Sequence, residues 1–231
     1  MVTFLLSENS RLAFGSPAAA ANYSRFVRRL PTNIEVKQVL ELPGPCKCGP
    51  LFKTPSLLFV GEFAARKGTF QLMALWDAIE AILAESRDAD NLQLVLIGKG
   101  ELEPTVRAWC SGRARVRLVV DPPRSLIHAH LRRSKALILL SQSNARWREQ
   151  TGLPVGEGPS HGCRIISTDQ IGFADWLKEH GHEIVQQDFD VYKLARRTVE
   201  VLSAAEDPDA IVHSLPQRDA RLEVDQWLRH T

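Results

Sequence analysis

The sequence has no long apolar run and no excess of one charge, and these absences exclude several classes of protein. No apolar stretch reaches the roughly 18 residues that a membrane-spanning helix needs. The start of the chain lacks the basic region and apolar core of a signal peptide. The formal net charge is only +2, so there is no strong signal for nucleic-acid binding. We expect a cytoplasmic protein, and peripheral contact with a membrane stays open.

Cysteine is also scarce, with four residues in the chain. Cys46 and Cys48 form a Cys-x-Cys pair, whereas Cys110 and Cys163 are isolated. A zinc site of the finger type would need further Cys or His ligands at short spacing, and none follows the pair nearby. We therefore predict free thiols in a reducing compartment and no bound metal.

The larger part of the chain alternates short apolar runs with stretches of helical spacing. Strands are predicted at residues 57–60, 92–97, 116–120, 136–140, 164–167 and 183–185, and helices at 68–86, 101–111, 125–133 (with Ser125 as its cap), 172–180, 190–205 and 218–229. Continuous apolar strands separated by helices are typical of a parallel sheet covered on both faces. We therefore predict an α/β, Rossmann-like domain over residues 55–231, with ligands beyond the carboxyl ends of its strands.

Residues 1–54 differ from this pattern and predict a reduced N-terminal segment with a linker. Strands are expected at residues 2–7 and 34–40, and a helix at residues 17–30. The stretch 43–55 is rich in proline and glycine, which interrupts regular structure. The fold class is thus a Rossmann-like domain preceded by a short, truncated βα or βαβ appendage.

Two glutamates eight positions apart, Glu149 and Glu157, enclose a Gly-Leu-Pro turn. Pro154 suits the first turn of a helix, because its φ is fixed and its missing N–H would be unpaired there. Glu149 would then lie on the loop before the helix, and Glu157 about one turn inside it. A helix N-terminus favours phosphate, and carboxylates accept hydrogen bonds from sugar hydroxyls. Solvated acids at an ordinary helix N-terminus are the alternative interpretation.

Four motifs in order give the chain a family resemblance. They are LLFVGEFAARKG at 57–68, LVLIGKGEL at 94–102, the Glu-(seven residues)-Glu stretch 149–157, and GCRIISTDQIGFADWL at 162–177. Over about residues 55–205 the chain resembles the C-terminal, donor-binding half of GT-B glycosyltransferases, in particular the retaining family 4 group. The resemblance implies a metal-independent enzyme without a cofactor. Its donor would be a nucleotide-diphosphate sugar such as a UDP- or GDP-sugar.

The resemblance also implies roles for individual residues. Lys67 matches the lysine that holds the donor diphosphate, and Glu157 the glutamate that accepts from the ribose hydroxyls. Glu149 matches the glutamate near the transferred sugar, while the backbone N–H groups of Gly152 and Leu153 would meet phosphate or sugar. A solvated lysine at a helix start is the plain alternative for Lys67.

Further positions at strand ends complete the implied donor site. Gly61 ends the first strand, and Val120 lies at the strand end that would frame the base. The family usually has an arginine directly after the glycine, and this chain has Glu62, so we expect Arg66 to supply the missing charge. The catalytic candidates are therefore Glu149, Lys67 and Arg66.

The short N-terminal segment leaves two functions open. The first is a retaining glycosyltransferase that acts on an unidentified acceptor. The second is a non-catalytic nucleotide-sugar-binding module, or the donor-binding half of a split enzyme. In either case a homodimer or a partner chain could supply the missing acceptor domain.

Overall fold

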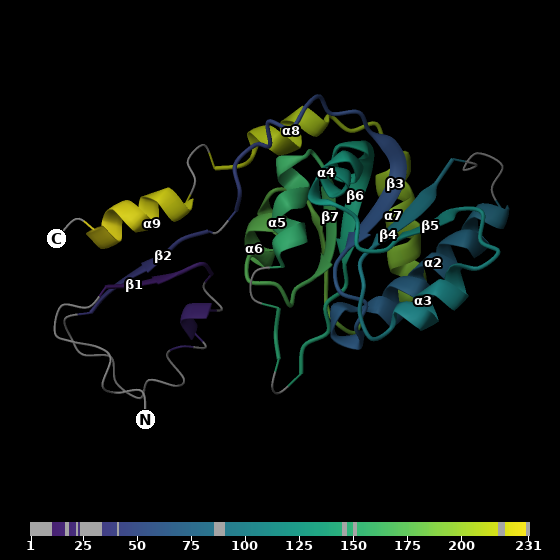
Figure 1. Ribbon diagram of the computed structural model, residues 1–231, viewed down its shortest axis with the longest axis horizontal. Helices are drawn as coiled ribbons and strands as arrows, with labels where there is room; N and C mark the ends of the chain where they lie inside the picture. Colours follow the sequence, from purple (N-terminus) through teal and green to yellow (C-terminus); the bar gives the residue numbers. More distant parts are fainter. Residues whose placement is uncertain are drawn as a thin grey trace.

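A six-stranded parallel sheet organises the larger part of the chain (Figure 1). The computed structural model describes residues 11–16, 19–21, 23, 34–40, 42–85, 91–144, 147–149, 152–216 and 220–229. The strands are β3 (Thr54–Val60), β4 (Gln93–Ile97), β5 (Val116–Val119), β6 (Ser134–Leu139), β7 (Arg164–Thr168) and β8 (Glu183–Val185). Their order is β5-β4-β3-β6-β7-β8, so the direction of winding reverses between β3 and β6. Ligands of open α/β sheets bind at such a switch point.

Helices cover both faces of this sheet, as the sequence predicted. They are η1 (Ala65–Lys67), α2 (Thr69–Glu85), α3 (Glu103–Cys110), α4 (Arg124–Arg133), α5 (Leu153–Ser160), α6 (Ala174–Glu179), α7 (Val191–Ser203) and α8 (Pro208–His213). Right-handed crossovers on either side of the switch point place α2 and α3 on one face and α4, α5 and α6 on the other. Figure 1 shows this division, with α7 beside α2.

The core explains why the strand sequences are continuously apolar. Leu57 and Leu58 in β3, and Leu137 and Ile138 in β6, are fully buried because helices pack on both sides of them. Trp76 in α2 is the largest of the fully buried side chains. The two central strands are thereby fixed, and their carboxyl ends hold the loops of the candidate site.

The N-terminal segment forms a separate small unit. β1 (Arg11–Phe14) pairs in parallel with β2 (Glu35–Gln38), and the C-terminal helix α9 (Ala220–Arg229) lies beside them (Figure 1). The Arg11 guanidinium donates to the backbone oxygen of Trp227 at 2.6 Å and lies 5.3 Å from the centre of its ring. The division at residue 54/55 remains a prediction, but the last helix contacts the first unit.

Several local expectations differ from the structure. Ser125 does not cap α4, because the helix begins at Arg124 with Pro123 at the capping position and no side-chain cap bond. The strand at 11–14 and helix α8 were not predicted. The strand expected at residues 2–7 and much of the helix expected at 17–30 lie outside the described residues, although residues 19–21 and 23 are helical.

The predicted linker has no helix or strand before Thr54, yet it is anchored to the sheet domain. Leu42 is buried, and the ammonium group of Lys53 donates to the backbone oxygens of Leu131, Ser134 and His161 at 3.0, 2.8 and 2.6 Å. Three acceptors satisfy all three N–H groups of a lysine. The segment before β3 is therefore held against α4, β6 and the end of α5.

Candidate functional site

The turns after β3 and β4 form the first part of the candidate site. The N–H of Gly61 donates to Ile97 and that of Phe63 to Lys99, both at 3.0 Å, so the two turns are joined backbone to backbone. A Cβ on Gly98 would lie 1.8 Å from the oxygen of Gly61, which only glycine avoids. The predicted residue Gly61 thus lies where two turns meet at the carboxyl edge.

The Lys-Gly turn is pressed against the loop that follows β6. Gly68 has φ +74°, and a Cβ there would lie 2.0 Å from the backbone oxygen of Leu140. The N–H of Gln142 donates to the oxygen of Arg66 at 2.8 Å. These contacts fix Lys67 beside the loop that carries Glu149.

Lys67 and Glu149 form an ion pair at this edge of the sheet. Their side chains are only 17% and 10% exposed. The Ser141 hydroxyl lies 3.4 Å from one carboxylate oxygen, and the N–H of Gly152 donates to the other at 3.3 Å. Both carboxylate oxygens of Glu149 therefore have a polar neighbour besides Lys67. The structure brings together Lys67, Glu149 and Gly152, which the sequence had selected.

Arg66 is also paired, and its partner is Glu62 on the same turn. The guanidinium carbon of Arg66 lies 5.0 Å from the ring centre of Trp147, and the Lys67 ammonium lies 5.6 Å from it. Such positions suit a cation–π interaction. Arg66 thus neutralises the charge of Glu62, which was expected to repel an anion. The same ion pair means that Arg66 must leave Glu62 before it can bind an anion.

Helix α5 supplies the other half of the site. Gly152 precedes it with φ +49°, and Pro154 lies in its first turn as expected. Leu153, the first residue of the helix, is 60% exposed, which leaves an apolar side chain open to solvent at the helix N-terminus. Glu157 lies one turn further and pairs with Arg124, the first residue of α4.

Val120 lies directly after β5, near the outer side of the carboxyl edge. The next residue, Asp121, has φ +47° and pairs with Lys99 at 2.9 Å. Both members of that pair are well exposed, so the pair contributes little to stability. Val120 is placed at the strand end as predicted, and its role toward a base stays a prediction.

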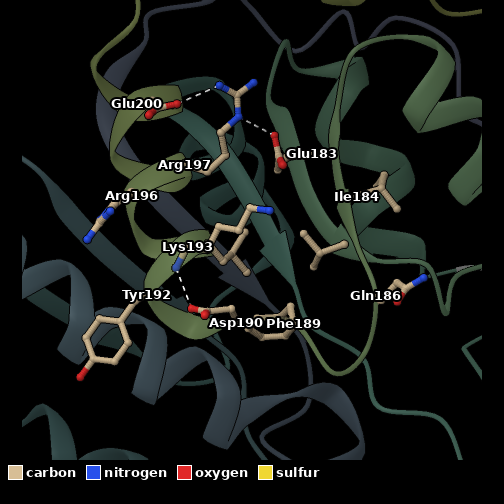
Figure 2. Close-up of a pocket in the computed structure, with 12 residues that line it drawn as sticks. Glu183, Ile184, Gln186, Phe189, Asp190, Tyr192, Lys193, Arg196, Arg197 and Glu200 are labelled. Atoms are coloured by element: carbon tan, nitrogen blue, oxygen red, sulfur yellow. Dashed lines mark hydrogen bonds and ion pairs between the residues drawn. The ribbon is translucent and has the colours of Figure 1, made fainter.

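A pocket of about 880 Å³ lies elsewhere, between edge strand β8 and helix α7 (Figure 2). Figure 2 shows Arg197 between Glu183 and Glu200, with separations of 2.8 and 2.9 Å. The charges of these three residues are thus paired with one another in the open groove. The pocket shares no lining residue with the Lys67–Glu149 site, and we do not assign it to the same chemistry.

Comparison with known families decides the relationship. A family profile described as "Glycosyl transferases group 1" matches residues 54–204. The chain belongs to the group 1 glycosyltransferases. No curated protein matched the sequence. Among the described residues, no helix has the length and apolar character to cross a bilayer.

Solved structures with the same fold include several glycosyltransferases. WaaG, a glycosyltransferase involved in lipopolysaccharide biosynthesis, is 13% identical with a TM-score of 0.68; the match covers 95% of this chain and 62% of WaaG. A UDP-forming α,α-trehalose-phosphate synthase from Burkholderia xenovorans is 13% identical with a TM-score of 0.69, covering 95% and 60% of the two chains. The GtfA/B complex contains a chain that is 15% identical with a TM-score of 0.62, covering 89% and 41%. This group 1 glycosyltransferase therefore has the GT-B type of fold and spans under two thirds of these chains.

Three residues that matter to the site were not selected from the sequence. Trp147 faces both cations, Ser141 supports Glu149, and Arg124 neutralises Glu157. A tryptophan within the polar loop 141–152 was an available signal. The partnership of Arg124 with Glu157 joins residues 33 positions apart and had no local signal.

Proposed function

We propose that this group 1 glycosyltransferase binds a nucleotide-diphosphate sugar at the carboxyl edge of β3 and β6 and transfers its sugar with retention of configuration. The observation that carries the proposal is the ion pair of Lys67 and Glu149 beside the N-terminus of α5. A cation, a carboxylate and the backbone N–H groups of the first turn of α5 then lie within one small region, and the N–H of Gly152 already donates to that carboxylate. This combination matches a donor that has both a diphosphate and sugar hydroxyls.

The ion pairs have a clear role before the donor arrives. Lys67 and Glu149 are mostly shielded from water, and either charge alone would be costly there. A diphosphate that binds Lys67 would replace Glu149 as its partner and free the carboxylate for hydroxyls of the sugar. Glu157 would exchange Arg124 for the ribose hydroxyls in the same way.

The chemistry asked of these residues is electrostatic. The bond between the sugar carbon and the diphosphate oxygen breaks while an acceptor oxygen bonds to the same face of that carbon. The acceptor proton passes to the leaving diphosphate. Lys67, Arg66 and the N–H groups of Gly152 and Leu153 would stabilise the charge that develops on the leaving group. No step requires a metal ion or a further cofactor.

Donor binding is the direct test of this proposal. UDP-, GDP- and ADP-sugars are screened by thermal shift, with UDP-sugars first because the synthase named above is UDP-forming. A true donor at 100 times its dissociation constant adds about 2.7 kcal/mol of stability. Absence of a shift with all three would overturn the proposal.

Variants then locate the site by titration calorimetry. We expect Lys67→Ala and Glu157→Ala each to weaken donor binding by about 1.5–3 kcal/mol, or roughly 10- to 150-fold. Arg197→Ala is the matched control, because it removes a paired cation in the separate pocket of Figure 2. If the control variant loses as much affinity as Lys67→Ala, the assignment of the site is wrong.

A second function, the donor-binding half of a larger assembly, is favoured by a specific observation. The unit before β3 has only β1 and β2 as strands among its described residues, which is small for a domain that must hold an acceptor. One of the similar structures is a complex, named GtfA/B, and GtfA is described as an O-GlcNAc transferase, so a related chain is known in an assembly. A chain that binds the donor but never turns it over would support this alternative.

A further inference from the structure

Two cysteines and two histidines meet on the side of the domain where the N-terminal connection joins it. Cys46 and Cys48 come from the segment between β2 and β3, His128 from α4, and His161 from the end of α5. Their Sγ and ring nitrogen atoms all lie within 4.8 Å of one another. Three distant parts of the chain thus bring four soft or borderline ligands to one place.

The separations match those of a tetrahedral zinc site. Zn–S bonds of about 2.3 Å and Zn–N bonds of about 2.05 Å at the tetrahedral angle place sulfur and nitrogen roughly 3.6 Å apart. Two nitrogens would be roughly 3.3 Å apart by the same geometry. The Sγ of Cys46 lies 3.6 Å from Nδ1 of His128, and Nε2 of His161 lies 3.2 Å from that same nitrogen.

Backbone contacts hold the Cys-x-Cys pair in position. The N–H of Cys46 donates to the oxygen of Ser160 at 2.9 Å, next to His161. The guanidinium of Arg132, one turn after His128 on α4, donates to the oxygen of Cys48 at 2.9 Å. Each cysteine is therefore tied to an element that carries one of the histidines.

His161 is oriented by a further contact. The residue is only 2% exposed, and its Nδ1 lies 2.8 Å from the backbone oxygen of Glu157. Because a carbonyl oxygen can only accept, Nδ1 carries the proton, and the lone pair of Nε2 faces the cluster. Metal-binding histidines commonly have this outer hydrogen bond, which fixes the tautomer.

We propose that Cys46, Cys48, His128 and His161 bind one zinc ion in a structural site. All four positions would be filled by protein ligands, which is the arrangement of a structural rather than a catalytic zinc. The ion would fasten the connection before β3 to α4 and α5. The sequence predicted no metal, because neither histidine lies near the cysteines along the chain.

The competing interpretation needs no metal. Nδ1–H of His128 would donate to Nε2 of His161, and the thiols would stay protonated. That arrangement predicts no stoichiometric metal and no spectral sign of thiolate ligands. The two interpretations are therefore separable by measurement.

The first experiment measures metal in the full chain. The protein is purified under reducing conditions without chelator, and its metal content is determined by mass spectrometry. We expect one zinc ion per chain. The zinc-free chain titrated with Co²⁺ should show the visible absorption of tetrahedral cobalt with a thiolate charge-transfer band. This readout needs no variant, and a chain with neither zinc nor the cobalt bands would overturn the proposal.

Variants assign the ligands. Cys46→Ser, Cys48→Ser and His128→Gln should each lose most of the bound metal, while Cys110→Ser keeps it, because Cys110 ends α3 outside the cluster. A strong chelator should lower the melting temperature of the parent and of Cys110→Ser, and have little effect on Cys46→Ser. Equal metal loss in Cys110→Ser, or full retention in His128→Gln, would contradict the four-ligand site.

Discussion

At the scale of single residues, the charges of the candidate site are paired with one another before any ligand binds. Lys67 pairs with Glu149, Arg66 with Glu62, and Arg124 with Glu157. A donor that binds here must therefore displace one member of each ion pair, because no charge of these pairs is free beforehand. The affinity depends on how readily each pair opens.

Glu62→Gln tests this exchange at Arg66. Removing the carboxylate frees the guanidinium and removes a negative charge, so we expect donor binding to tighten by about 2- to 5-fold, since exposed pairs are worth up to about 1 kcal/mol. The gain should shrink in high salt. Glu103→Gln is the control, because Glu103 also pairs with an arginine one turn away, Arg107, on another helix. Unchanged affinity in Glu62→Gln would show that Arg66 does not reach the diphosphate.

His182 gives a prediction on pH. Burial, followed by the nearby charges of Arg164 and His180, lowers its pKa to about 3. The unfolded chain, with a pKa of about 6.5, takes up a proton that the folded chain refuses, so stability falls as the pH drops below 6.5. The loss due to His182 should be about 2 kcal/mol at pH 5 and about 4–5 kcal/mol near pH 3.

The matched variant for this test is His182→Asn. Nδ1 of His182 accepts from the N–H of Ile165 at 3.0 Å, and the asparagine side-chain oxygen could replace it without titrating. Urea unfolding at pH 7 and pH 5 compares the two proteins. If His182→Asn loses as much stability as the parent between pH 7 and pH 5, the pH dependence does not come from His182.

At the scale of elements, two glycines with similar φ angles allow the cost of a left-handed backbone to be distinguished from the cost of a steric clash. Gly68 has φ +74° and Gly112 has φ +77°, but nothing lies within 4 Å of a Cβ at Gly112, whereas one at Gly68 would meet Leu140. Gly112→Ala should cost about 1 kcal/mol for its left-handed backbone. Gly68→Ala should cost about 1–3 kcal/mol more, because backbone must move.

Donor affinity should respond to the same pair of substitutions. Gly68 adjoins Lys67, so a shifted turn should weaken donor binding in Gly68→Ala and leave Gly112→Ala unaffected. Thermal unfolding and titration calorimetry provide the two measurements. Equal stability of both variants would mean that the turn after β3 shifts at little cost and accommodates the added Cβ of Gly68→Ala.

The positions of strands and helices were the part of the structure that the sequence predicted best. Buried strands such as 57–60 and 136–140 were predicted because their apolar runs are continuous, and α5 because Pro154 marks its first turn. The prediction of Ser125 as a cap was wrong because α4 begins at Arg124, so Pro123 holds the capping position and Ser125 lies inside the helix.

What the sequence missed depends on contacts between distant segments. The ion pair of Arg124 and Glu157 joins α4 to α5, and the cluster that contains Cys46 and His161 joins the segment before β3 to the end of α5. Neither contact can be predicted from the spacing of residues along the chain. Lys67 and Glu149 were selected through family motifs, whereas their direct ion pair needed the structure.

At the scale of the whole molecule, the small N-terminal unit sets an expectation for turnover. A two-domain glycosyltransferase closes over the reacting bond, which orients the acceptor and excludes water. With one small unit on that side, we expect slow donor hydrolysis by the isolated monomer. Efficient transfer should require self-association or a partner chain.

Light scattering combined with a donor-turnover assay checks this expectation. Activity that rises with protein concentration, in parallel with dimer formation, would agree with it. A strict monomer that transfers rapidly to a simple acceptor would contradict it, and would show that the unit of β1, β2 and α9 suffices.

The contact between Arg11 and Trp227 joins residues 216 positions apart. A ribosome adds roughly 5–20 residues per second, so β1 is made about 10–40 s before the helix that lies beside it. All six strands of the larger sheet are synthesised within that interval. β1 can therefore pair with β2 early in synthesis, whereas its contact with α9 forms only after the whole of the larger sheet has been made.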